Sequence, residues 1–204
     1  MDKVSHGLTL GILSVAQPQY VFLAENGRIL IEKEIKRTRL TGNRIIPSIK
    51  SCLDEINSSI KSIDTFMALS GPGSMTGIRA GLAPIRAWGY VSNKNVLLLP
   101  TLSVLASGFD KPILALMAAG KDKWWGQAFS GEMKDTPRIM DEEKLKDYDN
   151  CDWTWISPAK IESKNAKVIK HSPIPKQIVD IMDNYNSTSW MRALPQYLFE
   201  ITND

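Results

Sequence analysis

Residues 70–79 have the sequence SGPGSMTGIR, and this stretch decides the fold of the chain. It follows an apolar run at 65–69, which predicts a buried strand, and precedes a run of small and apolar residues at 78–91, which predicts a helix. A strand, a glycine-rich turn and a helix in this order direct backbone N–H groups and a helix N-terminus toward an anion. The stretch therefore predicts either a phosphate-binding loop or a tight packing turn.

The spacing of the glycines excludes the two common nucleotide-binding motifs. A P-loop needs Gly-Lys five residues after its first glycine, but Thr76 stands there and no lysine follows. A dinucleotide-binding loop needs a third glycine three residues after the second, and Gly77 comes one residue late. Ser74 or Thr76 could instead cap the following helix. The candidate anion-binding residues are Gly71, Gly73, Ser74 and Thr76.

The elements around this loop predict the fold class. Three strands are expected first, joined in part by a hairpin turn at Asn26-Gly27, and the helices and strands then alternate. The order βββαβαβα is typical of an α/β fold of the ribonuclease-H-like or actin-like type. The predicted strands span 8–15, 20–24, 28–35, 63–69 and 96–99, and the predicted helices 43–60, 78–91 and 102–107.

A boundary at 108–111 divides the chain into two predicted domains. Residues 1–110 form the first, which carries the glycine loop, and residues 111–204 form a smaller, shortened α/β domain. The second is expected to contain strands at 112–118, 124–129, 137–140, 153–156 and 166–169, helices at 141–147 and 174–185, and an extended tail at 195–198.

The composition of the chain bears on which kinds of partner, metal site and location to expect. The chain has 204 residues, 43% of them hydrophobic, and its net charge of +3 does not by itself call for an acidic partner. Cys52 and Cys151 have neither disulfide nor zinc spacing, and His6 and His171 are expected on the surface, so neither a metal site nor a catalytic residue is predicted. No apolar run is long enough for a membrane span, so we expect a cytoplasmic protein without a membrane partner.

The motif GPGSMTGIRAGLA at 71–83 resembles the GPGSFTGLRxGLA signature of the TsaB (YeaZ) family. Residues 44–47, 99–106 and 194–198 are also similar to family segments. The resemblance implies an actin-like ATPase (ASKHA) fold of two ribonuclease-H-like units. It also implies a role in forming N6-threonylcarbamoyladenosine at position 37 of tRNAs that read ANN codons. Members of the family are non-catalytic partners of a TsaD-type transferase, joined by a TsaE-type ATPase, and reach tRNA through that complex.

The resemblance places the partner surface, or a homodimer surface, on the helices at 43–60 and 75–91. Substituting Ile78 or Leu82 by Glu is then expected to abolish association without unfolding the chain, and Pro84 is expected to kink the second helix. ATP or ADP at the partner interface is the one cofactor left open. The candidate interface residues are Arg44, Ile45, Ile49, Met75, Ile78, Arg79, Leu82, Ile85 and Trp88.

Departures from the family pattern favour the absence of catalysis. The family's first strand ends in Asp-Thr-Ser, whereas residues 13–17 read LSVAQ without an acid, and residues 118–125 lack the family's acid and arginines. An actin-like ATPase or small-molecule kinase stays open as an alternative, with Asp64 and Asp122 as its candidate acids. A diverged paralogue that only self-associates is a second alternative.

Overall fold

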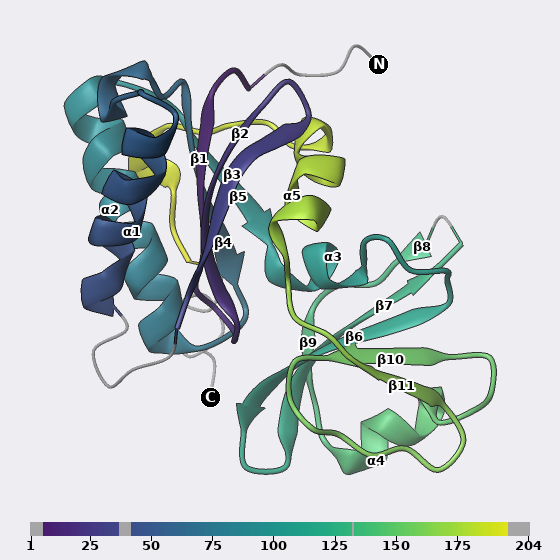
Figure 1. Cartoon of the computed structure of the whole chain (residues 1–204). Coiled ribbons are helices and arrows are strands. Elements are labelled where there is room, and N and C mark those ends of the chain that lie inside the picture. Colours follow the sequence, from purple (N-terminus) through teal and green to yellow (C-terminus); the bar gives the residue numbers. More distant parts are fainter. Residues whose placement is uncertain (1–5, 37–41, 132, 196–204) are drawn as a thin grey trace. The chain divides into compact units, whose positions relative to one another are not determined.

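A computed structural model describes residues 6–36, 42–131 and 133–195 of the chain (Figure 1). The chain forms two compact units. The first contains Met1–Pro100 and Pro173–Asp204, and the second contains Thr101–Ser172. Each unit is built on one mixed sheet flanked by helices, which confirms the predicted two-unit ribonuclease-H-like and actin-like fold class.

The first unit has a five-stranded sheet with the order β3-β2-β1-β4-β5. β2 lies antiparallel to β1 and β3, whereas β4 lies parallel to β1 and β5. Exposure alternates along β3 because one face of this edge strand meets water, as the sequence pattern predicts. The strands are β1 Thr9–Leu13, β2 Gln19–Glu25, β3 Arg28–Ile35, β4 Thr65–Gly71 and β5 Val96–Pro100.

Helices cover both faces of this sheet (Figure 1). α1 (Gly42–Glu55) and α2 (Met75–Ser92) pack on one face, and α5 (Pro175–Ile181) packs on β2 and β3 from the other. α1 ends five residues before its predicted end because Asn57 adopts a left-handed conformation with φ of 51°, which stops a helix. α2 runs without a break through Pro84. The kink expected there stays a prediction.

The second unit has a sheet with the order β11-β10-β6-β7-β8, and β9 pairs with β7. β6 lies antiparallel to β7 and parallel to β10, and α3 packs on these three strands. The elements are α3 Thr101–Ala106, β6 Ile113–Gly120, β7 Lys123–Ser130, β8 Met133–Lys134, β9 Arg138–Met140, α4 Glu142–Leu145, the 3₁₀ turn η2 Lys146–Tyr148, β10 Thr154–Ser157 and β11 Lys167–Lys170.

The domain boundary differs from the prediction at both ends. The second unit begins at Thr101 rather than 111, and residues 173–195 belong to the first unit. Backbone hydrogen bonds of 2.7 Å in each direction join Val96 of β5 to Thr188, which gives this edge of the sheet a partner from far along the chain. The predicted extended tail lies, from residue 196 onward, outside the described residues.

The histidine prediction is wrong for His6. Its side chain is buried, and its Nε2 lies 3.1 Å from the carbonyl oxygen of Met182, so it joins the start of the described chain to the segment after α5. His171 lies edge-on to the ring of Phe109. Within the described ranges, no helix is both long and apolar enough to cross a membrane.

Candidate functional site

The glycine loop turns the chain from the end of β4 into α2. Gly71 and Gly73 have φ of 107° and 157°, which residues with a Cβ rarely adopt, so glycine is required for this path. Beside the turn, the hydroxyl of Ser70 donates a hydrogen bond of 3.3 Å to the carbonyl oxygen of Leu99 on the neighbouring strand. The loop is therefore fixed against the sheet before the helix begins.

Ser74 is the N-cap of α2. Its hydroxyl oxygen accepts a hydrogen bond of 3.2 Å from the backbone N–H of Gly77, and its own N–H donates to the carbonyl oxygen of Val15 at 3.0 Å. Thr76, the other predicted cap, is the second residue of the helix and has an exposed side chain. Two N–H groups that could have bound an anion are thus already paired within the protein.

Ser14, just after β1, contacts the first turns of α2 closely. Its hydroxyl donates a hydrogen bond of 2.7 Å to the carbonyl oxygen of Gly77. A Cβ at position 77 would lie 2.0 Å from the carbonyl oxygen of Ser14, and one at Gly81 would lie 2.5 Å from its hydroxyl oxygen. Glycine is required at both positions because the backbone of Ser14 occupies the space of a side chain at 77, and the side chain of Ser14 occupies that at 81.

The four anion candidates therefore lie together in one loop, but in different environments. Gly71 is buried, Gly73 is half-buried, and Ser74 and Thr76 are exposed. Because the N–H groups of Ser74 and Gly77 are bonded to the protein, the geometry is that of a packing turn. Anion binding at these residues stays a prediction.

Five of the nine interface candidates lie in the core of the first unit and cannot form a free surface. These are Ile45, Ile49, Ile78, Leu82 and Ile85. Trp88 is half-buried, with its ring stacked on that of Phe66 at a centroid distance of 6.0 Å. The apolar line of α2 faces the sheet, because an amphipathic helix buries its most apolar face. Arg44, Met75 and Arg79 are exposed.

A different row of residues forms the exposed face of α2. We call it the outer stripe, and it follows helical spacings of three and four residues. Two alanines stand at its centre, and larger side chains lie at its ends. Apolar side chains near it are also exposed, with Met75 exposed by 42% and Val91 by 80%. The outer stripe consists of Thr76, Arg79, Ala83, Ala87 and Tyr90.

Neither of the two acids considered for an enzyme is part of the glycine loop. Asp64 precedes β4, whereas the loop follows it, and its carboxylate accepts hydrogen bonds from the N–H of Leu8 at 3.0 Å and from Lys94 Nζ at 3.1 Å. The bond from Leu8 and then that from Lys94 lower the pKa of Asp64. Asp122 lies in the second unit, in the turn before β7. In the described part of the chain, no three His, Cys, Asp or Glu residues are grouped to hold a metal ion.

Comparisons with known proteins agree with this geometry. A family model described as TsaD, tRNA N6-adenosine threonylcarbamoyltransferase, matches residues 36–185. An uncharacterized protein with similarity to peptidase YEAZ from Pseudomonas aeruginosa has a similar crystal structure, with a TM-score of 0.79, 17% identity, and coverage of 94% of this chain and 99% of that chain. YeaZ from Pseudomonas aeruginosa follows with a TM-score of 0.77, 16% identity and the same two coverages. A search of curated proteins found no match.

Proposed function

The chain belongs to the TsaD family, as a divergent member with the fold of the YeaZ (TsaB) structures, and from this premise we propose that it is a non-catalytic partner subunit. In this proposal it binds and activates a TsaD-type transferase in the complex that makes N6-threonylcarbamoyladenosine at position 37 of ANN-decoding tRNAs. The observation that carries the proposal is the outer stripe of α2.

The outer stripe has the shape that a partner helix requires. Ala83 and Ala87 present only methyl groups, so a second helix axis can approach to the short end of the usual range of about 8–10 Å. Tyr90, exposed by 64%, and Val91 provide apolar area at one end of the stripe, and Met75 provides it at the other. Exposed apolar side chains grouped along one helix are typical of protein interfaces. On α1, Ile46 is a further exposed apolar side chain, with 50% of its surface accessible.

Two features of the first unit support a role without catalysis. Ser14 lies in the segment where the resemblance places an acid, and its hydroxyl is bonded to the carbonyl oxygen of Gly77. Asp64 is held by Leu8 and Lys94 next to the start of β4. Phosphoryl transfer needs a metal-binding carboxylate near the phosphates. Ser14 has no carboxylate, and that of Asp64 lies at the opposite end of β4 from the glycine loop.

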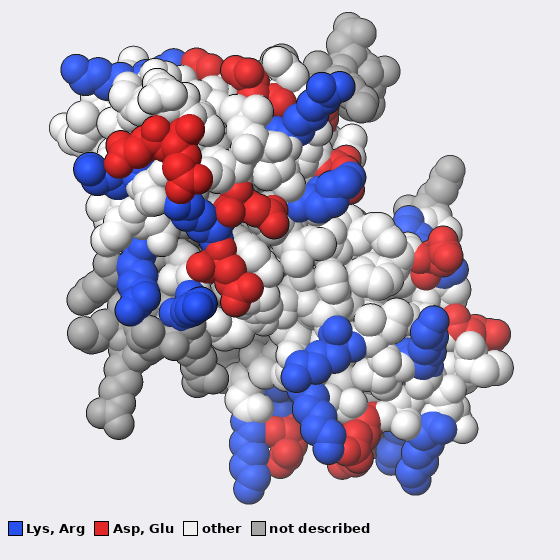
Figure 2. All heavy atoms as spheres, in the orientation of Figure 1, with Lys and Arg blue, Asp and Glu red and all other residues white. Residues whose placement is uncertain are grey.

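The charge distribution supports indirect contact with tRNA. In the face shown in Figure 2, Lys and Arg side chains lie among Asp and Glu side chains rather than in one broad basic area. Direct binding to a nucleic-acid backbone relies on a continuous basic surface. We therefore propose that the transferase, rather than this chain, contacts the tRNA. In the same proposal, a TsaE-type ATPase joins the assembly, any ATP or ADP binds at the partner interface, and the complex works in the cytoplasm.

Co-purification with the TsaD-type subunit of the same organism tests the proposal. Size-exclusion chromatography of the mixture should give a heterodimer peak, and Ala83→Glu should abolish it because a carboxylate would be buried against the partner helix. Ala119→Glu is the matched control, since Ala119 is also exposed but lies on β6 in the second unit. Circular dichroism should be native for both variants.

Two results would contradict the proposal. One is a wild-type protein that does not shift with the transferase, and the other is a folded Ala83→Glu variant that still binds it. Light scattering of the chain alone measures self-association. A homodimer that uses the outer stripe should dissociate as the transferase is added, whereas one that persists in the mixture would favour a self-associating paralogue.

A further inference from the structure

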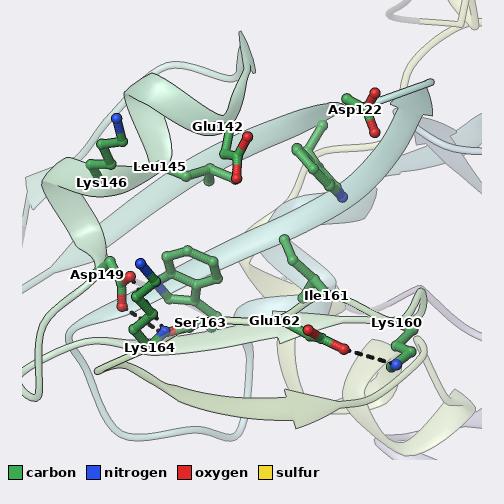
Figure 3. A pocket seen from close by; sticks show the side chains of 12 residues that line it. Asp122, Glu142, Leu145, Lys146, Asp149, Lys160, Ile161, Glu162, Ser163 and Lys164 are labelled. Carbon is green, nitrogen blue, oxygen red and sulfur yellow. Dashed lines mark hydrogen bonds and ion pairs between the residues drawn. The ribbon is translucent and has the colours of Figure 1, made fainter.

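A cavity of about 700 Å³ lies within the second unit, whereas the outer stripe and the glycine loop belong to the first (Figure 3). Its walls come from α4, from the start of β7, from β10 and from the loop that joins β10 to β11. A volume of this size lies within the range of small-molecule sites, which is about 300–1,000 Å³. Four segments that are distant in sequence thus enclose one space.

The floor of the cavity is aromatic and apolar. Leu145 and Trp155 are buried members of the core of this unit, and Trp124 and Ile161 are half-buried side chains packed against that core. The indole N–H of Trp155 donates a hydrogen bond of 2.9 Å to the carbonyl oxygen of Tyr148, so the polar edge of that ring is satisfied inside the protein. The lining therefore offers indole surface to a flat, apolar group.

The rim carries charged groups of both signs. Lys160 and Glu162 neutralise each other at 2.8 Å. Glu142 extends from α4 with its carboxylate near Leu145, opposite Ile161, while Lys146 points away from these side chains (Figure 3). Glu142 and Lys164 have no ion-pair partner among the residues that the structure describes. Asp122 also lines the cavity and has no ion-pair partner in the described part of the chain. Two carboxylates, those of Glu142 and Asp122, and the ammonium group of Lys164 thus remain at the rim for a ligand.

Asp149 fixes the conformation of the loop at 163–166, which forms the wall of the cavity that includes Lys164. Its Oδ1 accepts hydrogen bonds from the hydroxyl of Ser163 at 2.6 Å and from the N–H groups of Asn165 and Ala166 at 2.9 and 3.2 Å. Its Oδ2 accepts from the N–H of Lys164 at 3.3 Å. Because these bonds fix the loop without a ligand, little conformational entropy is lost when a ligand enters.

We propose that this cavity binds a nucleoside phosphate. The base stacks on the indole of Trp124, the carboxylate of Glu142 accepts hydrogen bonds from the ribose hydroxyl groups, and the ammonium group of Lys164 binds the phosphate. A simple anion would leave the aromatic floor unused, and an apolar ligand would leave Glu142 and Lys164 unpaired, whereas a nucleotide offers a partner to the floor, to Glu142 and to Lys164. The ligand is either a free nucleotide or an unstacked nucleotide of a single-stranded RNA.

Isothermal titration calorimetry of the full chain with AMP, adenosine and a single-stranded pentaadenylate tests this site. Wild type should bind AMP about tenfold more tightly than adenosine, because the phosphate adds a charge-assisted contact. Lys164→Ala should remove that difference, and Glu142→Gln should weaken AMP and adenosine by the same factor. Lys170→Ala, an exposed lysine on β11 that does not line the cavity, is the matched control and should leave all three affinities unchanged.

The outcomes separate the two sources of the ligand. Pentaadenylate that binds no more tightly than AMP indicates a free nucleotide, and pentaadenylate that binds at least about tenfold more tightly indicates RNA. No saturable heat with any of the three ligands up to about 10 mM would overturn the proposal. A folded Lys164→Ala variant that keeps the preference for AMP would overturn it as well, and neither variant depends on the buried Trp155.

Discussion

The carbonyl oxygen of Ser14 lies 2.0 Å from the point where the Cβ of any residue other than glycine would stand at position 77. The hydroxyl of the same serine donates to the carbonyl oxygen of Gly77 at 2.7 Å. The end of β1 and the first turn of α2 are therefore joined at a distance that only backbone atoms allow. The motif around Gly77 accordingly has a mechanical function, whatever else it binds.

Gly77→Ala should destabilise the first unit by about 3 kcal/mol, because the added methyl group must displace backbone rather than a flexible side chain. Urea unfolding followed by circular dichroism measures the change in midpoint. Met75→Ala, two residues earlier and exposed, should change the free energy of unfolding by no more than about 0.5 kcal/mol. Equal midpoints for the two variants would show that the backbone contact with Ser14 does not constrain the helix.

Ser74→Ala should lower the free energy of unfolding by about 1 kcal/mol, since it leaves the N–H of Gly77 without its cap. Thr76→Ala removes a neighbouring exposed hydroxyl that does not cap the helix, so it should cost less than about 0.5 kcal/mol. The comparison can be made in the same urea experiment. A larger loss for Thr76→Ala than for Ser74→Ala would contradict the capping geometry.

Ile78→Glu should unfold the first unit instead of merely blocking association. The side chain of Ile78 is only 1% exposed. Burying an unpaired carboxylate there would cost enough free energy to offset the total stability of a domain, which is about 5–15 kcal/mol. The far-ultraviolet circular dichroism of this variant should lose its native amplitude, while that of Ala83→Glu should keep it. A native spectrum for Ile78→Glu would mean that α2 exposes its apolar face.

Asp149 should make the second unit sensitive to acid. Hydrogen bonds, first from Ser163 and then from the backbone of Asn165, lower its pKa from 3.8 to about 2. A depressed pKa means that the carboxylate contributes stability above about pH 3.8, and that this contribution disappears as pH falls through about 2. The midpoint difference between wild type and Asp149→Ala should therefore be constant near neutral pH and shrink in that window.

A midpoint difference that stays constant down to the lowest pH would show that Asp149 does not titrate with a lowered pKa. Lys160→Ala is the control for general effects of loop charge, because among the described residues Lys160 forms an ion pair only with the exposed Glu162. Its unfolding midpoint should remain close to that of wild type at neutral pH, because an exposed ion pair contributes little to stability.

The two cysteines should differ sharply in reactivity. Burial raises the pKa of the Cys52 thiol to about 11, whereas Cys151 is exposed. Because the thiolate is the reacting species, a thiol reagent at mildly alkaline pH should modify one cysteine in the native protein and both in guanidinium chloride. Cys151→Ser should remove the fast reaction. A fast reaction that persists in Cys151→Ser would show that the helix α1 opens readily.

Most elements of the first unit could be predicted from the sequence because the patterns that indicate them lie within short segments. The alternation at 28–35 predicts β3 to the residue, and the apolar run and glycines at 65–77 predict β4, the turn and the start of α2. The end of α1 was missed because the apolar spacing continues to Ile60, which lies in a separate 3₁₀ turn after the left-handed Asn57. The helical spacing of apolar residues does not show where the backbone changes direction.

The candidate surface was harder to predict than the fold. The apolar line through Ile78, Leu82 and Ile85 marks the core face of α2, and periodicity alone cannot distinguish a face that meets the sheet from one that meets a partner. The sequence feature that could have indicated the exposed face was the pair of alanines at 83 and 87. The cavity of the second unit was missed because its residues come from segments up to about forty positions apart and form no motif.

The return of residues 173–195 to the first unit has a consequence for synthesis on the ribosome. The nascent chain completes β5 well before Thr188, the residue that pairs with Val96, has been translated. At about 5–20 residues per second, that edge waits several seconds while the whole second unit emerges. The inserted unit can thus finish folding while the unit that surrounds it still has an open strand edge, which is where a chaperone would have to act.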